Sequence, residues 1–393
     1  MLSWWNMAVT EVEKQHIGDE TWSSGIWRIG VFPKMKLVKL FLLILLSLCS
    51  VGIMAVYSSD PLRSSGFLGG SFFGRQVIWC LLSWLVFFLV SRIDYHWFLK
   101  LEWIIYFFII VSLAGVLVFG NGDETGAKRW ILSRSVQPSE FSKVAFAIFL
   151  SALFSRSIDA YGSWKLMIQS FFFTILPVFL IFVEPDLGTS LVILILWFAA
   201  LYCSGFHWKK FLAVFAFFGV FFPLSWPFLK DYQKNRLLSF LSPQSDPLGT
   251  GYNVLQSQIA IGGGGILGKG WLLGTQSQLR FLPARYTDFI FAAWCEQLGF
   301  VGGILMVTLF LFLIWVILRI GREAPDLEGK ILASLFGIMF IFQTTINIGM
   351  NMGVMPVTGI PLPFVSYGGS SLLINMVAMG IVWNIAKAGG SEQ

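Results

Sequence analysis

The sequence predicts an all-α polytopic membrane protein with about ten transmembrane helices. Of its 393 residues, 56% are hydrophobic and only 12% are charged, whereas soluble domains carry about 25% charged residues. The hydrophobic residues form continuous blocks, such as Leu187 to Cys203, instead of the alternating pattern of a membrane β-barrel. Because an unpaired peptide group in hydrocarbon costs several kcal/mol, these blocks must cross as helices.

Ten hydrophobic spans can be placed along the chain. Several are shorter than the ~20 residues that a bilayer core requires, and the eighth is long enough to begin outside the bilayer or to tilt. The spans cover residues 38–58, 76–91, 103–120, 140–155, 167–183, 187–204, 211–229, 288–318, 331–353 and 370–388.

The Lys and Arg residues of the short loops orient these spans. One set of loops holds most of them, which predicts that this set and both chain termini are cytoplasmic in a multi-pass protein of the cytoplasmic (inner) membrane. On the outer side, basic residues gather before the fourth span and between residues 230 and 285. An anionic ligand outside the membrane would explain these exceptions, and tolerated loop charges are the alternative.

The chain divides into three parts. Residues 1–35 form a polar cytoplasmic extension, residues 36–388 the transmembrane domain, and residues 389–393 a cytoplasmic tail. One long extracytoplasmic loop, residues 230–287, joins the seventh and eighth helices, and loops of this length are usually functional or disordered. It contains an amphipathic stretch from Tyr252 to Ile261. Its glycine run, residues 262–265, predicts either a hinge or a close backbone approach.

Composition argues against several classes of site. The four cysteines lie inside hydrophobic blocks, which favours small buried side chains over a disulfide framework. With three histidines and no Cys-x-x-Cys, a histidine or thiolate metal site is not expected. The net charge of +6 indicates attraction to anionic lipid headgroups, and no compact basic domain exists to bind nucleic acid.

Four outward-facing segments hold nearly all the polar residues that could carry chemistry. They cover residues 126–143, 184–189, 268–291 and 356–371. In this order they resemble the SEDS family (shape, elongation, division and sporulation), and the resemblance extends from about residue 36 to 388. Residues 274–278 and the Phe281-Leu282-Pro283 run are similar to the RodA branch of that family more than to the FtsW branch.

The resemblance implies a peptidoglycan glycosyltransferase that polymerises lipid II, an undecaprenyl-pyrophosphoryl disaccharide-peptide, for cell-wall elongation and shape. It also implies a class B penicillin-binding protein as the cross-linking partner, together with other membrane proteins of an elongation complex. The chain departs from the family pattern at Glu184, Ala284 and Tyr286, where Gln, Glu and His are usual. The change at Tyr286 removes a titratable neighbour of Asp288.

Asp288 matches the family's catalytic aspartate. A carboxylate at the outer membrane face suits this role, because a general base that takes the proton of the attacking sugar hydroxyl contributes roughly 10²–10⁴-fold to the rate. The alternative is structural, since Thr287 and Asp288 also form a good helix start, where a capping side chain contributes about 1 kcal/mol.

The departing pyrophosphate needs cationic partners. Arg129 and Lys143 match family positions important for activity, and Lys128 is adjacent. Arginine suits bidentate phosphate contacts and lysine acts as a point charge. The alternatives are that Lys143 extends from its helix to the lipid headgroups, or that it pairs with Glu140, three residues earlier on the same helix face.

Glu184 and Asp186 flank a tight turn and could hold Mg²⁺ or Mn²⁺ against the pyrophosphate, although Asp186 could instead cap the following helix. Glu296, inside the eighth span, is interpreted either as functional or as part of the helix packing. Ser366 and Tyr367 are expected to line the substrate site, and Glu140 is a further candidate for substrate binding.

Two other functions compete with the glycosyltransferase. A lipid II flippase would have charges near mid-bilayer and matching halves, whereas here the charges gather at one face. A non-catalytic cell-wall scaffold is favoured only by the altered residues Ala284 and Tyr286, and the presence of Asp288, Arg129 and Lys143 argues against it.

Overall fold

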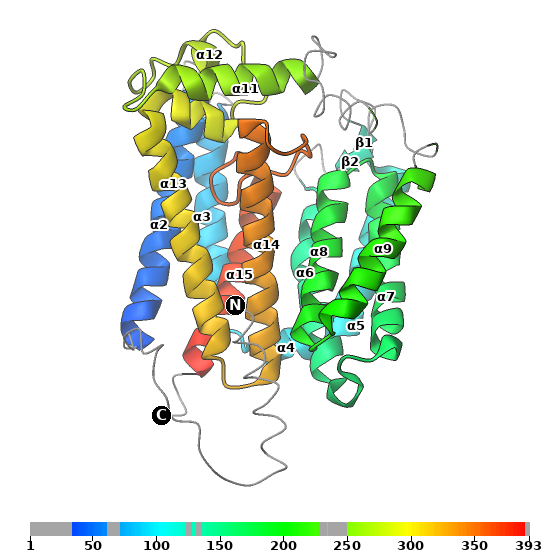
Figure 1. Ribbon diagram of the computed structural model, residues 1–393. Coiled ribbons are helices and arrows are strands. Elements are labelled where there is room, and N and C mark those ends of the chain that lie inside the picture. The colour runs from blue at the N-terminus through cyan, green and yellow to red at the C-terminus, as the bar shows by residue number, and fades with distance from the viewer. Residues whose placement is uncertain are drawn as a thin grey trace.

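A computed structural model describes residues 34–60, 71–122, 128–130, 136–225, 227, 234 and 250–389 (Figure 1). Most of the predicted extension and tail, and the first part of the predicted long loop, therefore lie outside the described residues. The described part is mostly helical, in agreement with the predicted all-α class.

Each of the ten predicted spans overlaps one helix. These helices are α2 (Lys34–Ser59), α3 (Phe72–Val90), α5 (Glu102–Phe119), α6 (Pro138–Ser155), α7 (Trp164–Val183), α8 (Leu187–Cys203), α9 (Trp208–Ser225), α13 (Ile290–Arg322), α14 (Leu327–Met352) and α15 (Gly369–Ala388). By length and composition, seven helices of the described residues can cross a membrane, namely α2, α3, α5, α7, α13, α14 and α15, and α8 is a shorter apolar helix. The molecule is thus a multi-pass membrane protein.

The remaining elements are short or lie outside the main bundle. They are α4 (Tyr95–Lys100), a 3-10 turn (Ile158–Ala160), α11 (Thr250–Gly264), α12 (Thr275–Gln278), and an antiparallel pair formed by β1 (Asn121–Gly122) and β2 (Lys128–Trp130). The strand pair and α4 were not predicted.

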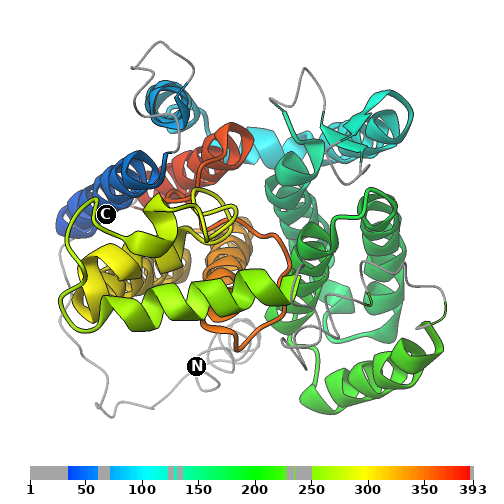
Figure 2. The same ribbon diagram turned by 90° about the horizontal axis from the view of Figure 1, so that it is seen from above.

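The helices form two groups that lie side by side (Figures 1 and 2). One group contains α2, α3, α13, α14 and α15, and α5 to α9 form the other. Helix α14 joins them, because it packs on α13 in the first group and on α6 and α8 in the second. The side chains of α14 are accordingly buried on most sides.

Helices α11 and α12 lie across one end of the first group, called the α11 end below (Figure 1). The predicted amphipathic stretch is the centre of α11. Its glycine run ends the helix by close approach: a Cβ on Gly264 would stand 2.1 Å from the carbonyl oxygen of Cys295. The chain then runs along α13, where the Phe300 N–H donates to the Gly265 carbonyl at 2.9 Å.

Helix α13 is interrupted at Gly299, whose φ of 66° and ψ of −161° are not helical. This break explains the unusual length of the eighth predicted span. A side chain at Gly299 would also meet the backbone of Gly268, 2.3 Å away. Only glycine combines this backbone conformation with this approach.

Glu296, one turn before the break, is completely buried. It accepts hydrogen bonds from the backbone N–H groups of Gln276 and Ser277 at 2.7 and 3.0 Å, and from Lys269 Nζ at 3.0 Å. A buried carboxylate is tolerable when it is paired and hydrogen-bonded in this way. Of the two interpretations of Glu296, the structure supports packing, because the side chain anchors α12 to α13.

The four cysteines are free and buried, as predicted. At the end of the bundle opposite α11, the Tyr95 hydroxyl donates to Asp326, the N-cap of α14, and Arg156 contacts Glu102. The short helix α4 is thereby tied to the turn between α13 and α14.

Candidate active site

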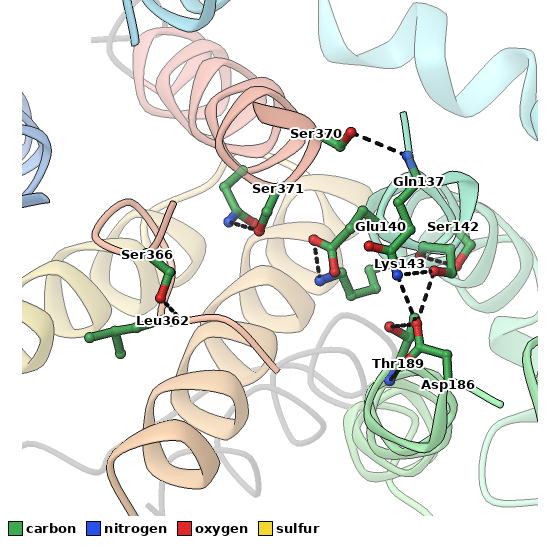
Figure 3. A network of polar contacts seen from close by, with 12 residues as sticks. Gln137, Glu140, Ser142, Lys143, Asp186, Thr189, Leu362, Ser366, Ser370 and Ser371 are labelled. Atoms are coloured by element: carbon green, nitrogen blue, oxygen red, sulfur yellow. Dashed lines mark hydrogen bonds and ion pairs between the residues drawn. The ribbon is translucent and has the colours of Figure 1, made fainter. Parts of the chain in front are cut away.

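The four segments singled out in the sequence meet at the α11 end. The Gln137 N–H donates to Ser370 Oγ at 3.2 Å, and Gln137 Nε2 donates to Asp186 Oδ2 at 3.1 Å (Figure 3). The first, second and fourth segments are joined by these two bonds. The third is joined to the fourth, because the Tyr367 N–H donates to the Tyr286 carbonyl at 2.8 Å.

Asp288 lies two residues before α13 and is partly exposed. The N-cap of α13 is Phe289, which makes no side-chain capping bond, so Asp288 does not occupy the capping position. Its backbone carbonyl is held from α14, where Asn347 Nδ2 and Asn351 Nδ2 donate to it at 3.1 and 2.9 Å. The residue is therefore fixed through its main chain.

Ser366 and Tyr367 brace the same loop. Ser366 Oγ donates to the Thr287 carbonyl at 2.7 Å and accepts from the Leu362 N–H at 2.9 Å. Tyr286 stacks on Phe72 with ring centroids 4.3 Å apart, and Tyr367 packs edge-on against Phe72 at 5.0 Å. Tyr286 is thus part of an aromatic cluster with Phe72 and Tyr367. The predicted substrate-lining role of Ser366 and Tyr367 stays a prediction.

Lys143 and Glu140 form a buried ion pair near the start of α6. Lys143 Nζ lies 2.7 Å from Glu140 Oε2, and their side chains are only 1% and 6% exposed (Figure 3). A lysine so deeply buried does not reach the lipid headgroups, which removes that alternative. The predicted pairing on one helix face is confirmed, and phosphate binding stays a prediction.

Arg129 on β2 reaches the turn between α7 and α8. Its Nε donates to the Glu184 carbonyl at 3.0 Å, and its guanidinium also donates to the Pro185 carbonyl. Since only part of its N–H groups is used in this way, the guanidinium retains donors for an anion. Lys128 is the first residue of β2, but its side chain lies outside the described residues.

Asp186 is the N-cap of α8. Its Oδ1 accepts from the Thr189 N–H at 3.1 Å, and its Oδ2 accepts from Thr189 Oγ1 at 2.9 Å and Ser139 Oγ at 3.0 Å (Figure 3). The capping interpretation of Asp186 is therefore confirmed. Its oxygens are occupied by protein donors.

Glu184 is in the opposite situation. It is 1% exposed, and neither carboxyl oxygen has a hydrogen-bond partner among the residues that the structure describes. Burial, together with the charge of Asp186, raises the pKa of Glu184 to about 8, although Arg129 opposes the shift. No group of three or more His, Cys, Asp or Glu side chains suited to a metal ion occurs among the residues that the structure describes.

The residues that hold the site together are not predicted individually by the sequence. Gln137 and Ser139 lie within one of the four predicted segments, whereas Asn347 and Asn351 lie outside all four. A signal for the asparagines was present, because two amides four residues apart in a hydrophobic span share a helix face and are costly in a membrane.

Residues 38–389 match the model of the family described as cell cycle protein, FTSW_RODA_SPOVE. The chain belongs to this family. The predicted resemblance is thereby confirmed, and the match extends over nearly all the described residues.

Individual relatives of known name support the same family assignment. The chain is 40% identical to the peptidoglycan glycosyltransferase MrdB of Escherichia coli K12, over 72% of this chain and 76% of that protein. It is 33% identical to the peptidoglycan glycosyltransferase RodA of Treponema pallidum, over 88% and 96%.

Solved structures of the family have the same fold. A chain from a study of polymerization and crosslinking by a peptidoglycan synthase complex matches with a TM-score of 0.75 and 30% identity, over 89% of this chain and 97% of that one. The crystal structure of the rod shape determining protein RodA of Thermus thermophilus matches with a TM-score of 0.63 and 26% identity, over 92% and 98%.

Proposed function

We propose that this peptidoglycan glycosyltransferase polymerises lipid II with Asp288 as its general base. The activity follows from its relatives in the family. One observation carries the assignment of the base: Asp288 is a partly exposed carboxylate whose main chain is fixed from α14, at the end of the bundle where all four polar segments meet.

The reaction transfers a glycan to a sugar hydroxyl. The acceptor hydroxyl oxygen attacks the anomeric carbon of the donor while Asp288 takes the hydroxyl proton. A new C–O bond forms, the bond to the lipid pyrophosphate breaks, and the pyrophosphate leaves with the electron pair. Attack opposite to the leaving group inverts the anomeric centre, and repeated transfer makes the enzyme processive.

Arg129, Lys128 and Lys143 would stabilise the pyrophosphate. Arg129 is held at the turn before α8 by two backbone carbonyls, which leaves further N–H groups for phosphate oxygens. Lys143 is aligned by Glu140 at 2.7 Å. Preorganised cations of this kind favour the transition state, because they need no reorientation as charge develops.

A divalent cation, Mg²⁺ or Mn²⁺, could assist these residues. The buried oxygens of Glu184, which have no partner in the described part of the chain, fit a metal ligand, whereas Asp186 fits poorly because protein donors occupy its oxygens. Mg²⁺ often binds one carboxylate together with substrate phosphates and water, so Glu184 would be the main protein ligand. Activity that survives chelation of divalent ions would exclude this part of the proposal.

The chain would cross the membrane ten times through the helices that match the predicted spans. The α11 end would be extracytoplasmic, with both termini, including residues 1–35 and 389–393, in the cytoplasm. A class B penicillin-binding protein would be the cross-linking partner, alongside other elongation-complex proteins. The similarity to a chain of a peptidoglycan synthase complex supports such a partner.

Polymerisation of purified lipid II, with the penicillin-binding partner present, tests the assignment. Asp288→Ala should form no glycan strands while its thermal unfolding matches that of wild type. Asp94→Ala is a suitable control, because it also removes a carboxylate, from the N-cap of the short helix α4 at the opposite end.

Equal product from wild type and Asp288→Ala would remove Asp288 from the mechanism. If wild type forms no product although its partner is competent, transfer of lipid II across vesicle membranes should be measured instead, since that result would favour a flippase.

A further inference from the structure

Asn347 and Asn351 stand out among the buried residues that the mechanism does not use. Both are completely buried on α14, and they lie about one helical turn apart on one face. Their side-chain amides converge on a single acceptor, the Asp288 carbonyl, at 3.1 and 2.9 Å. Burying two amides is unfavourable unless their hydrogen bonds are satisfied, so their other partners are informative.

Asn351 replaces a hydrogen bond of α13. In a continuous helix the Ala292 N–H would donate to the Asp288 carbonyl, four residues earlier. Instead, the Ala292 N–H donates to Asn351 Oδ1 at 3.1 Å, while Asn351 Nδ2 donates to the Asp288 carbonyl. The next bond, from the Ala293 N–H to the Phe289 carbonyl, is helical at 3.2 Å. The Asn351 amide thus lies between the Ala292 N–H and the Asp288 carbonyl. It prevents α13 from extending back to include Asp288.

Asn347 fixes this arrangement to the fourth segment. Its Nδ2 donates to the Ile360 carbonyl at 2.8 Å as well as to that of Asp288. The Asn347 backbone carbonyl in turn accepts from Asn351 Nδ2 at 2.8 Å. The two amides therefore connect α14, the start of α13 and the segment before Pro361 in one network.

We propose that Asn347 and Asn351 are positioning residues that keep Asp288 out of α13 and aim its carboxylate at the acceptor hydroxyl. This inference rests on the proposed role of Asp288 as base. If Asp288 were part of α13, its side-chain direction would be set by the first helical turn, and its carboxylate would point in a different direction. Misplacing a catalytic group by about 1 Å can cost on the order of 10²-fold in rate.

The test uses the full chain with its penicillin-binding partner and compares Asn351→Leu and Asn347→Leu with wild type. Gln343→Leu is the matched control, because Gln343 is a buried amide one turn earlier on the same helix, and its Nε2 has no partner within the described ranges. We expect kcat to fall roughly 10- to 100-fold in the asparagine variants. The KM and the stoichiometry of lipid II binding should be unchanged, and Gln343→Leu should retain wild-type turnover.

Lipid II binding, measured beside turnover on the same samples, separates positioning from folding. If binding stoichiometry and turnover fall in the same proportion, the asparagine only supports the fold and the inference is overturned. Wild-type kcat in Asn351→Leu overturns it as well. If Asn351→Leu does not fold, Asn351→Ser replaces it, since a single hydroxyl cannot bridge both groups.

The two proposals fail in different ways. Full activity of Asp288→Ala would remove the base, and with it the reason for positioning. An inactive Asp288→Ala together with active asparagine variants would leave the base in place and remove only the positioning role.

Discussion

Lys143 and Glu140 are two charges placed inside the protein, 2.7 Å apart. Removing a charge from water costs several kcal/mol, and a close partner roughly offsets this cost, whereas a single buried charge stays uncompensated. The pair is therefore weak evidence for stability. Its value in the site is that it holds a cation in one fixed place.

Single and double substitutions should separate these two effects. Lys143→Ala or Glu140→Ala should lower the free energy of unfolding by about 3–5 kcal/mol, because each leaves an unpaired buried charge. Lys143→Met/Glu140→Gln should recover most of this stability, yet polymerise no lipid II. Thermal unfolding and polymerisation can be measured on the same samples. Strand synthesis by the double variant would show that Lys143 does not act on the substrate.

Glu184 should make stability depend on pH. Burial raises its pKa from 4.5 to about 8 in the folded protein, so folding favours the protonated form. Its contribution is fully present below pH 4.5 and is lost as the pH rises through about 8. The free energy of unfolding should fall by at most about 1.4 kcal/mol per pH unit in this window.

Glu184→Gln should remove this slope, because the amide is neutral at every pH. Thermal unfolding of wild type and variant in metal-free buffer, over the same window, measures the difference. Parallel profiles for the two proteins would contradict the raised pKa.

At the scale of elements, the fourth segment is held between helices by glycines. A Cβ on Gly52 of α2 would lie 2.4 Å from the Phe364 carbonyl oxygen, and a Cβ on Gly188 of α8 would lie 3.0 Å from the Thr358 carbonyl oxygen. Phe364 itself has a φ of 63°, a conformation that costs a non-glycine residue on the order of 1–2 kcal/mol. The backbone of this segment is therefore fixed from both sides.

Gly52→Leu should displace residues 361–367 and with them Ser366, which bonds the Thr287 carbonyl. We expect turnover to fall by on the order of 10²-fold and stability by about 1–3 kcal/mol. Gly115→Leu is the control, because a Cβ there meets no atom of the described residues within 4 Å. Similar losses in both variants would indicate a general intolerance of larger residues rather than displacement of the segment.

At the scale of the whole molecule, the orientation in the membrane can be tested by labelling. Leu267 near the α11 end is 79% exposed, and Lys209 at the opposite end is also exposed. The native cysteines are all buried, so single new cysteines at these positions give a clear signal. An impermeant maleimide should label Leu267→Cys in intact cells and Lys209→Cys only after permeabilisation. The reverse pattern would invert the proposed topology.

Hydropathy located the main helices because each hydrophobic block is longer than a turn-rich loop allows, and the family pattern located the four polar segments. The break at Gly299, the strand pair and the asparagine network could not be predicted in this way. They depend on a single non-helical φ/ψ pair, on two- and three-residue strands, and on bonds between residues 59 or more positions apart. The break and the strand pair leave no periodic signal in the sequence, and the spacing of the two asparagines does not show which groups they bond.

The fourth segment is clamped between α2 and α8, and this affects how lipid substrates and products enter and leave the enzyme. Because these helices belong to different groups, the clamp opposes any hinge-like separation of the two groups at the α11 end. The isoprenoid tails of the substrates stay in the bilayer. They must then enter and leave the site laterally, between helices that do not move apart. We therefore expect the two helix groups to keep one arrangement during polymerisation. The growing polymer would then move past a rigid site, without a cycle of opening and closing.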